Sequence, residues 1–454
     1  MSLKSINPFT NRLIEEFEEF PEGKLEEILT RSAGAFENWK KTKFGYRETL
    51  MNKVARLLIE NRIEYAESVT AEMGKPVSES MAEVEKCAWV CDYYAKNAES
   101  FLRSESVDTD ADMSYISYEP LGTVLGIMPW NFPFWQVFRF AVPTLMAGNT
   151  VLLKHASNVQ ICARHIEHIF TAAGFPGSVF QNLVIGSDKV GKIIEHDIVR
   201  AVSLTGSELA GQKVAETAGR KIKKTLLELG GSNAFVILED ADIEKAVETG
   251  IKARMQNAGQ SCIAAKRFIV HEMVIEKFIA LFKEKLSEIH QGDPMDVKTG
   301  IGPLASIHQA ETVESQVRIS VGMGARIIAG GDRDQAFFPP TLLVDVKPGM
   351  PVFDEEVFGP VAPVILARNT KEAVTLSNKT KFGLGVSLFT NDVKKAKDLI
   401  PEFEDGAVFI NALVKSDPRL PFGGTKQSGF GRELAIHGIR EFVNVKTVYI
   451  KKFT

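Results

Sequence analysis

The 454-residue chain is poor in cysteine, with only Cys87, Cys91, Cys162 and Cys262. So few cysteines in a chain of this length exclude a disulfide framework and indicate a reducing compartment. Cys87 and Cys91 lie one helical turn apart, but a tetrahedral metal site needs further ligands and none is nearby in the sequence. We therefore predict no metal site.

The chain also lacks an excess of charge of one sign and lacks long hydrophobic runs. Lys and Arg number 54 against 58 Asp and Glu, a net charge of −4, so neither a polyanion-binding surface nor a nucleic-acid partner is expected. No segment has about 18 consecutive apolar residues, and the N-terminus has no apolar core of signal-peptide length. These absences predict a cytoplasmic protein without a membrane partner.

The length and the hydrophobic pattern predict an α/β protein. A chain of 454 residues with 44% hydrophobic residues exceeds what one core usually organises, so two large domains are expected. A helical pattern covers about residues 25–102, without a strand before it. From residue 150 strands and helices alternate, which predicts parallel sheets covered by helices, with a boundary near Leu229. The tail, residues 441–450, alternates like an exposed edge strand, which favours pairing with another chain.

Three short motifs carry candidate chemistry. Cys262 follows small and polar residues in Gln-Asn-Ala-Gly-Gln-Ser-Cys, where a thiol is accessible rather than packed. Glu228 lies in an apolar strand that ends in paired glycines, a costly place for a charge. Asn131 interrupts a hydrophobic strand in Pro-Trp-Asn-Phe-Pro and offers a hydrogen-bond donor. Together they suggest a nucleophile, a base and an oxyanion donor.

These motifs resemble those of the aldehyde dehydrogenase superfamily, and the resemblance spans nearly the whole chain. It implies two open, mostly parallel α/β domains plus a small β oligomerisation element. The cofactor-binding domain would comprise residues 1–110 and 122–228, and the catalytic domain residues 229–426. Residues 111–121 and 432–454 would join the subunits of a homodimer or homotetramer.

The sequence has no Gly-x-Gly-x-x-Gly fingerprint, but a different phosphate cradle is present. Gly206 and Ser207 stand between a strand and a helix, where backbone N–H groups and the helix dipole favour an anion. The resemblance assigns this turn to the cofactor pyrophosphate. It assigns the following further residues to the cofactor site: Trp130, Lys154, Leu229, Glu356 and Phe358.

The residue three positions after Lys154 bears on cofactor choice. Many NAD-preferring relatives carry a glutamate there, which binds the ribose hydroxyls and repels a 2′-phosphate. This chain has Ser157, whose hydroxyl removes the repulsion and can donate to phosphate. NADP is therefore expected to be accepted and weakly preferred over NAD.

The resemblance implies that the Cys262 thiol attacks an aldehyde and forms a thiohemiacetal. An unperturbed thiol is only slightly ionised near neutrality, so Cys262 needs help from its surroundings. Asn131 and the Cys262 amide would stabilise the oxyanion. After hydride transfer to the cofactor, Glu228 would activate the water that hydrolyses the thioester, because an apolar setting raises the pKa of a carboxyl toward neutrality.

The substrate prediction depends on four residues. Arg139 matches an arginine that binds the distal carboxylate in succinate-semialdehyde dehydrogenases, and Ser416 matches a serine beside it. Some of these enzymes carry a second arginine where this chain has Gln256. The Gln256 amide can donate a hydrogen bond to a carboxylate but carries no positive charge. Ser261 precedes the nucleophile. The chain most resembles the compact bacterial enzymes of this group, so we predict oxidation of a small aldehyde, succinic semialdehyde, to succinate.

Three alternatives remain open at this point. The first is a dehydrogenase for uncharged short-chain aldehydes, in which Arg139 would be structural. The second is a CoA-acylating relative, which the presence of the hydrolytic base Glu228 disfavours. The third is a nucleotide-binding or structural protein that has lost catalysis, which the joint presence of Cys262, Glu228 and Asn131 disfavours.

Overall fold

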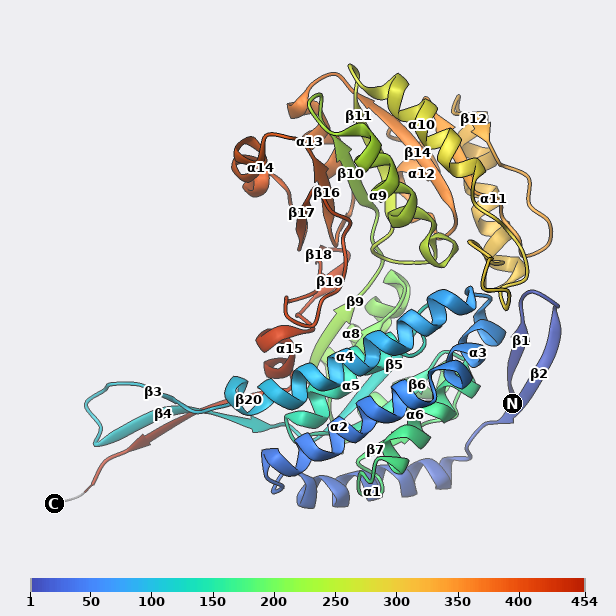
Figure 1. The fold of residues 1–454 in the computed structure, drawn as a ribbon. Coiled ribbons are helices and arrows are strands. Elements are labelled where there is room, and N and C mark those ends of the chain that lie inside the picture. Colours follow the sequence, from blue (N-terminus) through green and yellow to red (C-terminus); the bar gives the residue numbers. More distant parts are fainter. Residues whose placement is uncertain (1, 453–454) are drawn as a thin grey trace.

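The computed structural model describes residues 2–452 and has two α/β units and a projecting arm (Figure 1). The first unit is built on a six-stranded sheet of order β19-β9-β8-β5-β6-β7, parallel except for β19 at its edge. Its strands are β5 (Thr123–Met128), β6 (Thr150–His155), β7 (Phe180–Asn182), β8 (Val199–Thr205), β9 (Lys224–Glu228) and β19 (Gly429–Phe430).

Helices cover both faces of this first sheet. On one face α2, α4, α5 and α6 bury a large apolar core, and on the other α1, α7 and α8 bury a smaller one. The helices of the unit are α1 (Glu22–Trp39), α2 (Phe44–Glu60), α3 (Arg62–Met73), α4 (Val77–Phe101), α5 (Trp135–Met146), α6 (Gln160–Ala172), η1 (Ser187–Lys189), α7 (Val190–Glu195), α8 (Glu208–Arg220) and α15 (Ala435–Glu441).

The second unit is built on a seven-stranded sheet of order β12-β13-β14-β11-β10-β16-β17, again parallel except for the edge strand β12. Its strands are β10 (Asn233–Ile237), β11 (Ala265–His271), β12 (Arg326–Ala329), β13 (Thr341–Val344), β14 (Val361–Ala367), β16 (Val386–Phe389) and β17 (Val408–Ile410). The helices are α9 (Ile243–Met255), η2 (Gln256–Gly259), α10 (Ile275–Ser287), α11 (Ile307–Gly322), α12 (Pro351–Asp354), α13 (Thr370–Asn378), α14 (Val393–Leu399) and η3 (Ile400–Glu402).

A three-stranded antiparallel sheet forms the arm and extends away from both units (Figure 1). Its order is β20-β4-β3, with β3 (Glu105–Ser106), β4 (Met113–Pro120) and β20 (Val443–Ile450). A short pair, β15 (Phe382–Gly383) and β18 (Thr425–Lys426), lies where the chain returns from the second unit to the first. Residues 111–121 and 432–452 supply the two long arm strands, while α15 of the second segment packs on α4 and α5; residues 453–454 of the predicted oligomerisation segment lie outside the described residues.

Two local expectations were wrong. An antiparallel hairpin, β1 (Ser2–Asn7) and β2 (Arg12–Glu18), precedes the helices. Its second strand is mostly exposed and charged, so its sequence shows no core-facing alternation.

The Asn131 motif is a loop between β5 and α5 and not part of a strand. Pro129 ends the strand because proline cannot donate a hydrogen bond to the sheet.

Candidate active site

The loop that carries Cys262 follows α9 in a strained conformation. Asn257 and Ala258 have φ of 53° and 51°, in the left-handed region that side chains with a Cβ rarely adopt. Glu79 of α4 accepts a hydrogen bond from the Asn257 backbone N–H at 2.7 Å. Such strain persists only where surrounding contacts hold it, and it is common at active sites.

Asn131 is joined to this loop by two hydrogen bonds. Its Nδ2 donates to the Gln260 carbonyl at 3.1 Å, and Asn257 Nδ2 donates to the Asn131 carbonyl at 2.7 Å. Asn131 is buried and lines a cavity that also contains Cys262. One amide hydrogen of Asn131 remains for an oxyanion at that cavity.

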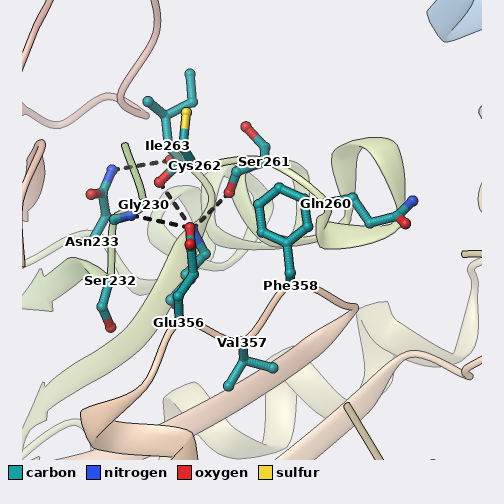
Figure 2. A network of polar contacts seen from close by, with 12 residues as sticks. Gly230, Ser232, Asn233, Gln260, Ser261, Cys262, Ile263, Glu356, Val357 and Phe358 are labelled. Atoms are coloured by element: carbon teal, nitrogen blue, oxygen red, sulfur yellow. Dashed lines mark hydrogen bonds and ion pairs between the residues drawn. The ribbon is translucent and has the colours of Figure 1, made fainter. Parts of the chain in front are cut away.

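A buried lysine, Lys266, holds the backbone of the loop that carries Cys262. Lys266 Nζ donates to the carbonyls of Ser261 and Cys262 at 2.7 and 2.9 Å, and to Glu356 Oε1 at 2.8 Å. Glu356 also accepts the Gly231 N–H at 3.1 Å. Figure 2 shows the Glu356 carboxylate directed at this backbone, whereas the Cys262 sulfur points away from it.

The environment of Cys262 disfavours a resting thiolate. Burial raises the pKa of the half-buried thiol to about 11, although the charges of Lys266 and Arg139 act in the opposite direction. The thiol is therefore protonated at neutral pH until another positive charge or a proton acceptor approaches it.

Glu228 ends β9 and is buried next to other charged groups. Its Oε1 has no hydrogen-bond partner within residues 2–452. Burial raises its pKa well above the usual range, against the positive charge of Arg139. Its carboxyl is directed toward Gly423, where an added Cβ would lie 2.9 Å from Oε1. The carboxyl has the protonation behaviour of a general base but must turn toward Cys262 to act as one.

Two cavities meet at Cys262. The larger, of about 660 Å³, has apolar walls that include Phe132, Trp135 and Phe422. The smaller, of about 240 Å³, is lined by Asn131 and by residues around Gly206 and Glu356. A thiol at this junction can contact one molecule in each cavity, as a reaction between a substrate and a cofactor requires.

The four predicted substrate residues, Arg139, Gln256, Ser261 and Ser416, all line the larger cavity. However, Arg139 lies on the fully buried helix α5 and forms a buried ion pair with Glu433. The Ser416 hydroxyl accepts a hydrogen bond from Lys86 Nζ at 2.8 Å, whereas the polar partners of Arg139 are Glu433 and Thr205.

Most of the predicted cofactor residues line the smaller cavity. These are Trp130, Gly206, Ser207, Leu229, Glu356 and Phe358. Lys154 is a buried residue near the end of β6, and desolvation lowers its pKa; Ser157 lies exposed in the loop that follows. The Ser207 hydroxyl caps α8 by accepting the Ala210 N–H at 3.4 Å, so the helix N-terminus faces this side.

The space beside Glu356 is kept open by glycine. A Cβ on Gly230 would lie 2.5 Å from Glu356 Oε2, and one on Gly231 would lie 2.7 Å from the Cys262 carbonyl. Only glycines allow the strand end, Glu356 and the nucleophile loop to approach so closely. The acceptors, donors and open space of the smaller cavity therefore fit the nicotinamide and pyrophosphate part of a dinucleotide, whereas Lys154 and Ser157 lie outside its lining.

Comparison with known proteins identifies the family. The model of the aldehyde dehydrogenase family matches residues 1–448. The chain belongs to the aldehyde dehydrogenase family. A probable NADP(+) succinate-semialdehyde dehydrogenase of Synechocystis sp. is 47% identical over 453 residues, with 99% of this chain and all of the relative covered. Succinate-semialdehyde dehydrogenase (NADP(+)) 1 of Mycobacterium tuberculosis is 44% identical over 456 residues, with the same coverage.

A solved structure of succinic semialdehyde dehydrogenase from Streptococcus pyogenes, in complex with NADP+, has a TM-score of 0.97 with this aldehyde dehydrogenase. It is 36% identical and covers 99% of this chain and 100% of its own. The predicted family and fold class are confirmed. Across residues 2–452, none of the helices has the length and apolar character needed to span a membrane.

Sequence reasoning missed four charged residues of this aldehyde dehydrogenase site: Glu79, Lys86, Lys266 and Glu433. Lys266 and the adjacent Arg267 lie in the wholly buried strand β11, and two adjacent cations in an apolar run were a usable signal. Glu79 and Lys86 lie in an ordinary amphipathic helix, whose pattern does not show that its polar side borders a cavity.

Proposed function

We propose that the protein oxidises succinic semialdehyde to succinate with NADP+ as the preferred oxidant. The observation that carries the proposal is the junction of the two cavities at Cys262. The names of the Synechocystis and Mycobacterium relatives agree with the predicted substrate and cofactor, at 99% coverage of this chain.

The reaction begins when the Cys262 thiol loses its proton to water and Sγ attacks the aldehyde carbon, which opens the carbon–oxygen double bond and forms a thiohemiacetal. Asn131 Nδ2 and the Cys262 backbone N–H donate hydrogen bonds to the oxygen as it gains negative charge. Asn131 is already held against the nucleophile loop, so little reorganisation is needed. Loss of one such donor typically costs about 2.7–4 kcal/mol of transition-state stabilisation.

When bound, NADP+ supplies the hydride acceptor in the smaller cavity. Glu356 and Phe358 would hold its nicotinamide half, and Ser207 with the start of α8 its pyrophosphate. Lys154 and Ser157 would contact the adenosine ribose and its 2′-phosphate. No carboxylate occupies position 157, so the phosphate meets no repulsion from that residue.

Hydrolysis of the resulting thioester requires a base. Glu228 takes a proton from water, which attacks the acyl carbon, breaks the carbon–sulfur bond and releases the carboxylic acid. Its raised pKa makes the ionised carboxylate a stronger base than that of an exposed glutamate.

The test is reduced-cofactor formation by purified protein with succinic semialdehyde, using NADP+ and NAD+ in parallel, and with product identification. The proposal predicts succinate, a higher kcat/KM with NADP+, and no dependence on CoA. A CoA thioester as product would instead support the acylating alternative. No reaction with either succinic semialdehyde or butyraldehyde would support the non-catalytic alternative.

We also propose that the arm joins subunits into a dimer or tetramer. Large apolar side chains of β4 and β20 are exposed, including Met113, Val445 and Tyr449. An edge strand with such residues is a template for pairing with a second copy. Light scattering should give a mass of at least two chains, and Val445→Lys should lower it. A monomeric wild-type mass would contradict this proposal.

A further inference from the structure

Lys86 is a cation in the larger cavity without a carboxylate partner. It projects from α4 into the space that also contains Cys262. Its Nζ donates to Ser416 Oγ at 2.8 Å and lies 4.1 Å from the centroid of the Trp135 ring. Both neighbours are neutral, and no carboxylate of residues 2–452 forms an ion pair with it.

The two carboxylates whose charges act on Lys86, Glu83 and Asp417, already have other partners. Glu83, on the same helix, forms a buried ion pair with Lys75 and accepts the N–H groups of Phe134 and Trp135. Asp417 forms an ion pair with Arg419 at 2.7 Å. These two carboxylates act on Lys86 only at longer range.

The other buried cation of the cavity, Arg139, differs in this respect. Its guanidinium forms an ion pair with the buried Glu433 and lies 4.6 Å from the Phe422 ring centroid. The positive charge of Arg139 also lowers the pKa of a second buried carboxylate, Glu228. An arriving carboxylate would therefore compete with Glu433 for Arg139, whereas Lys86 has no such competitor.

The walls of the cavity strengthen an interaction with Lys86. Phe132, Trp135 and Phe422 form an apolar part of the wall, and an ion pair is stronger beside apolar surroundings than in bulk solvent. Burial, together with the charge of Arg139, lowers the pKa of Lys86 to about 8. The ammonium is therefore poorly compensated by the protein, and an anionic ligand would relieve this cost.

We propose that Lys86, oriented by Ser416 and Trp135, binds the distal carboxylate of the substrate and selects carboxylated aldehydes over uncharged ones. This assignment rests on the proposed oxidation of succinic semialdehyde. It gives Ser416 the role of positioning Lys86, and it gives Arg139 the role of compensating Glu433 and Glu228.

The test compares kcat/KM for succinic semialdehyde and for butyraldehyde in the wild type and three variants. Lys86→Met keeps the length of the side chain and removes the charge, and Lys86→Arg keeps the charge. Lys252→Met is the matched control, because Lys252 lines the same cavity but is exposed. Thermal unfolding of each variant verifies that it is folded.

Lys86→Met is expected to lower the ratio of the two kcat/KM values by roughly 10- to 150-fold, the range for loss of a hydrogen bond to a charged group. Lys86→Arg should retain most of the ratio. Lys252→Met should change it by less than about fivefold, as for an exposed charge. Succinate should inhibit butyraldehyde oxidation by the wild type more strongly than by Lys86→Met.

Three results would overturn the assignment, and they are distinguishable. A wild type without preference for succinic semialdehyde would overturn the proposed substrate and this assignment together. A wild type with a strong preference that Lys86→Met retains would overturn only the role of Lys86. An equal loss for both aldehydes in Lys86→Met would likewise overturn it and indicate a structural role.

Discussion

Lys266 Nζ lies 2.8 Å from Glu356 Oε1, and this partly buried ion pair links the nucleophile loop to the proposed cofactor site. The same ammonium donates to the carbonyls of Ser261 and Cys262. Its positive charge also lowers the pKa of Cys262, against the larger effect of burial. One lysine therefore affects the position of the nucleophile, its ionisation and the orientation of Glu356.

Lys266→Met should destabilise the protein, because it leaves the Glu356 carboxylate and two loop carbonyls without their donor. We expect a loss of about 1–3 kcal/mol in the free energy of unfolding, measured by urea denaturation, and a raised KM for NADP+. The double variant Lys266→Met/Glu356→Gln should recover part of the stability, because the unpaired charge is removed. Equal stability of Lys266→Met and wild type would contradict this coupling.

Alkylation by iodoacetamide should report the raised pKa of Cys262. A raised pKa means that the thiolate fraction at neutral pH is small and grows with pH. The rate should rise about tenfold per pH unit between about pH 7 and pH 10 without levelling off. Cys262→Ala is the control, because Cys87, Cys91 and Cys162 are buried. A plateau near pH 8 would show that the thiol ionises far more readily than its surroundings predict.

The buried ion pair between Arg139 and Glu433 should matter for stability mainly because each charge compensates the other. Removing one charge should therefore cost more than removing both. Arg139→Met leaves a buried carboxylate uncompensated, and breaking such a pair typically costs about 3–5 kcal/mol. Arg139→Met/Glu433→Gln should be more stable than the single variant in urea denaturation. If Arg139→Met unfolded like the wild type and lost only activity toward carboxylated aldehydes, Arg139 and not Lys86 would be the anchor.

The reaction class was predictable from the sequence because the chemistry depends on residue types in short motifs. Cys262, Glu228 and Asn131 each follow or precede glycines or prolines that mark a turn, and alternation of strands and helices predicts the parallel sheets on which these turns lie. The N-terminal hairpin could not be found in this way. Strand β2 is mostly exposed, so its sequence lacks the alternation of apolar and polar residues that a core-facing strand shows.

The partners of the charged residues could not be predicted. Glu433 lies far along the chain from Arg139, and Ser416 lies far from Lys86, so no spacing relates them. The apolar sequence of α5 does indicate that Arg139 needs a compensating group, but only the fold shows that Glu433 supplies it. The sequence therefore predicted a cation, Arg139, in the larger cavity without showing that Glu433 pairs with it.

Cofactor choice should change at position 157. Ser157→Glu places a carboxylate beside the proposed site of the 2′-phosphate, so kcat/KM with NADP+ should fall on the order of 10- to 100-fold while the value with NAD+ is retained. Ser157→Ala, which removes only the hydroxyl, should cause a smaller loss. An unchanged kcat/KM with NADP+ in Ser157→Glu would contradict the proposed position of the 2′-phosphate beside residue 157.

The most direct test of the proposed mechanism uses Glu228→Gln, which keeps the shape of the side chain and removes the base. Its reaction with succinic semialdehyde and NADP+ is quenched with acid, and the peptides are analysed by mass spectrometry. The mechanism predicts a burst of one NADPH per active site and one succinyl group on the peptide that contains Cys262, because acylation proceeds and hydrolysis is slow. Steady turnover at the wild-type rate with no acyl group on Cys262 would contradict it.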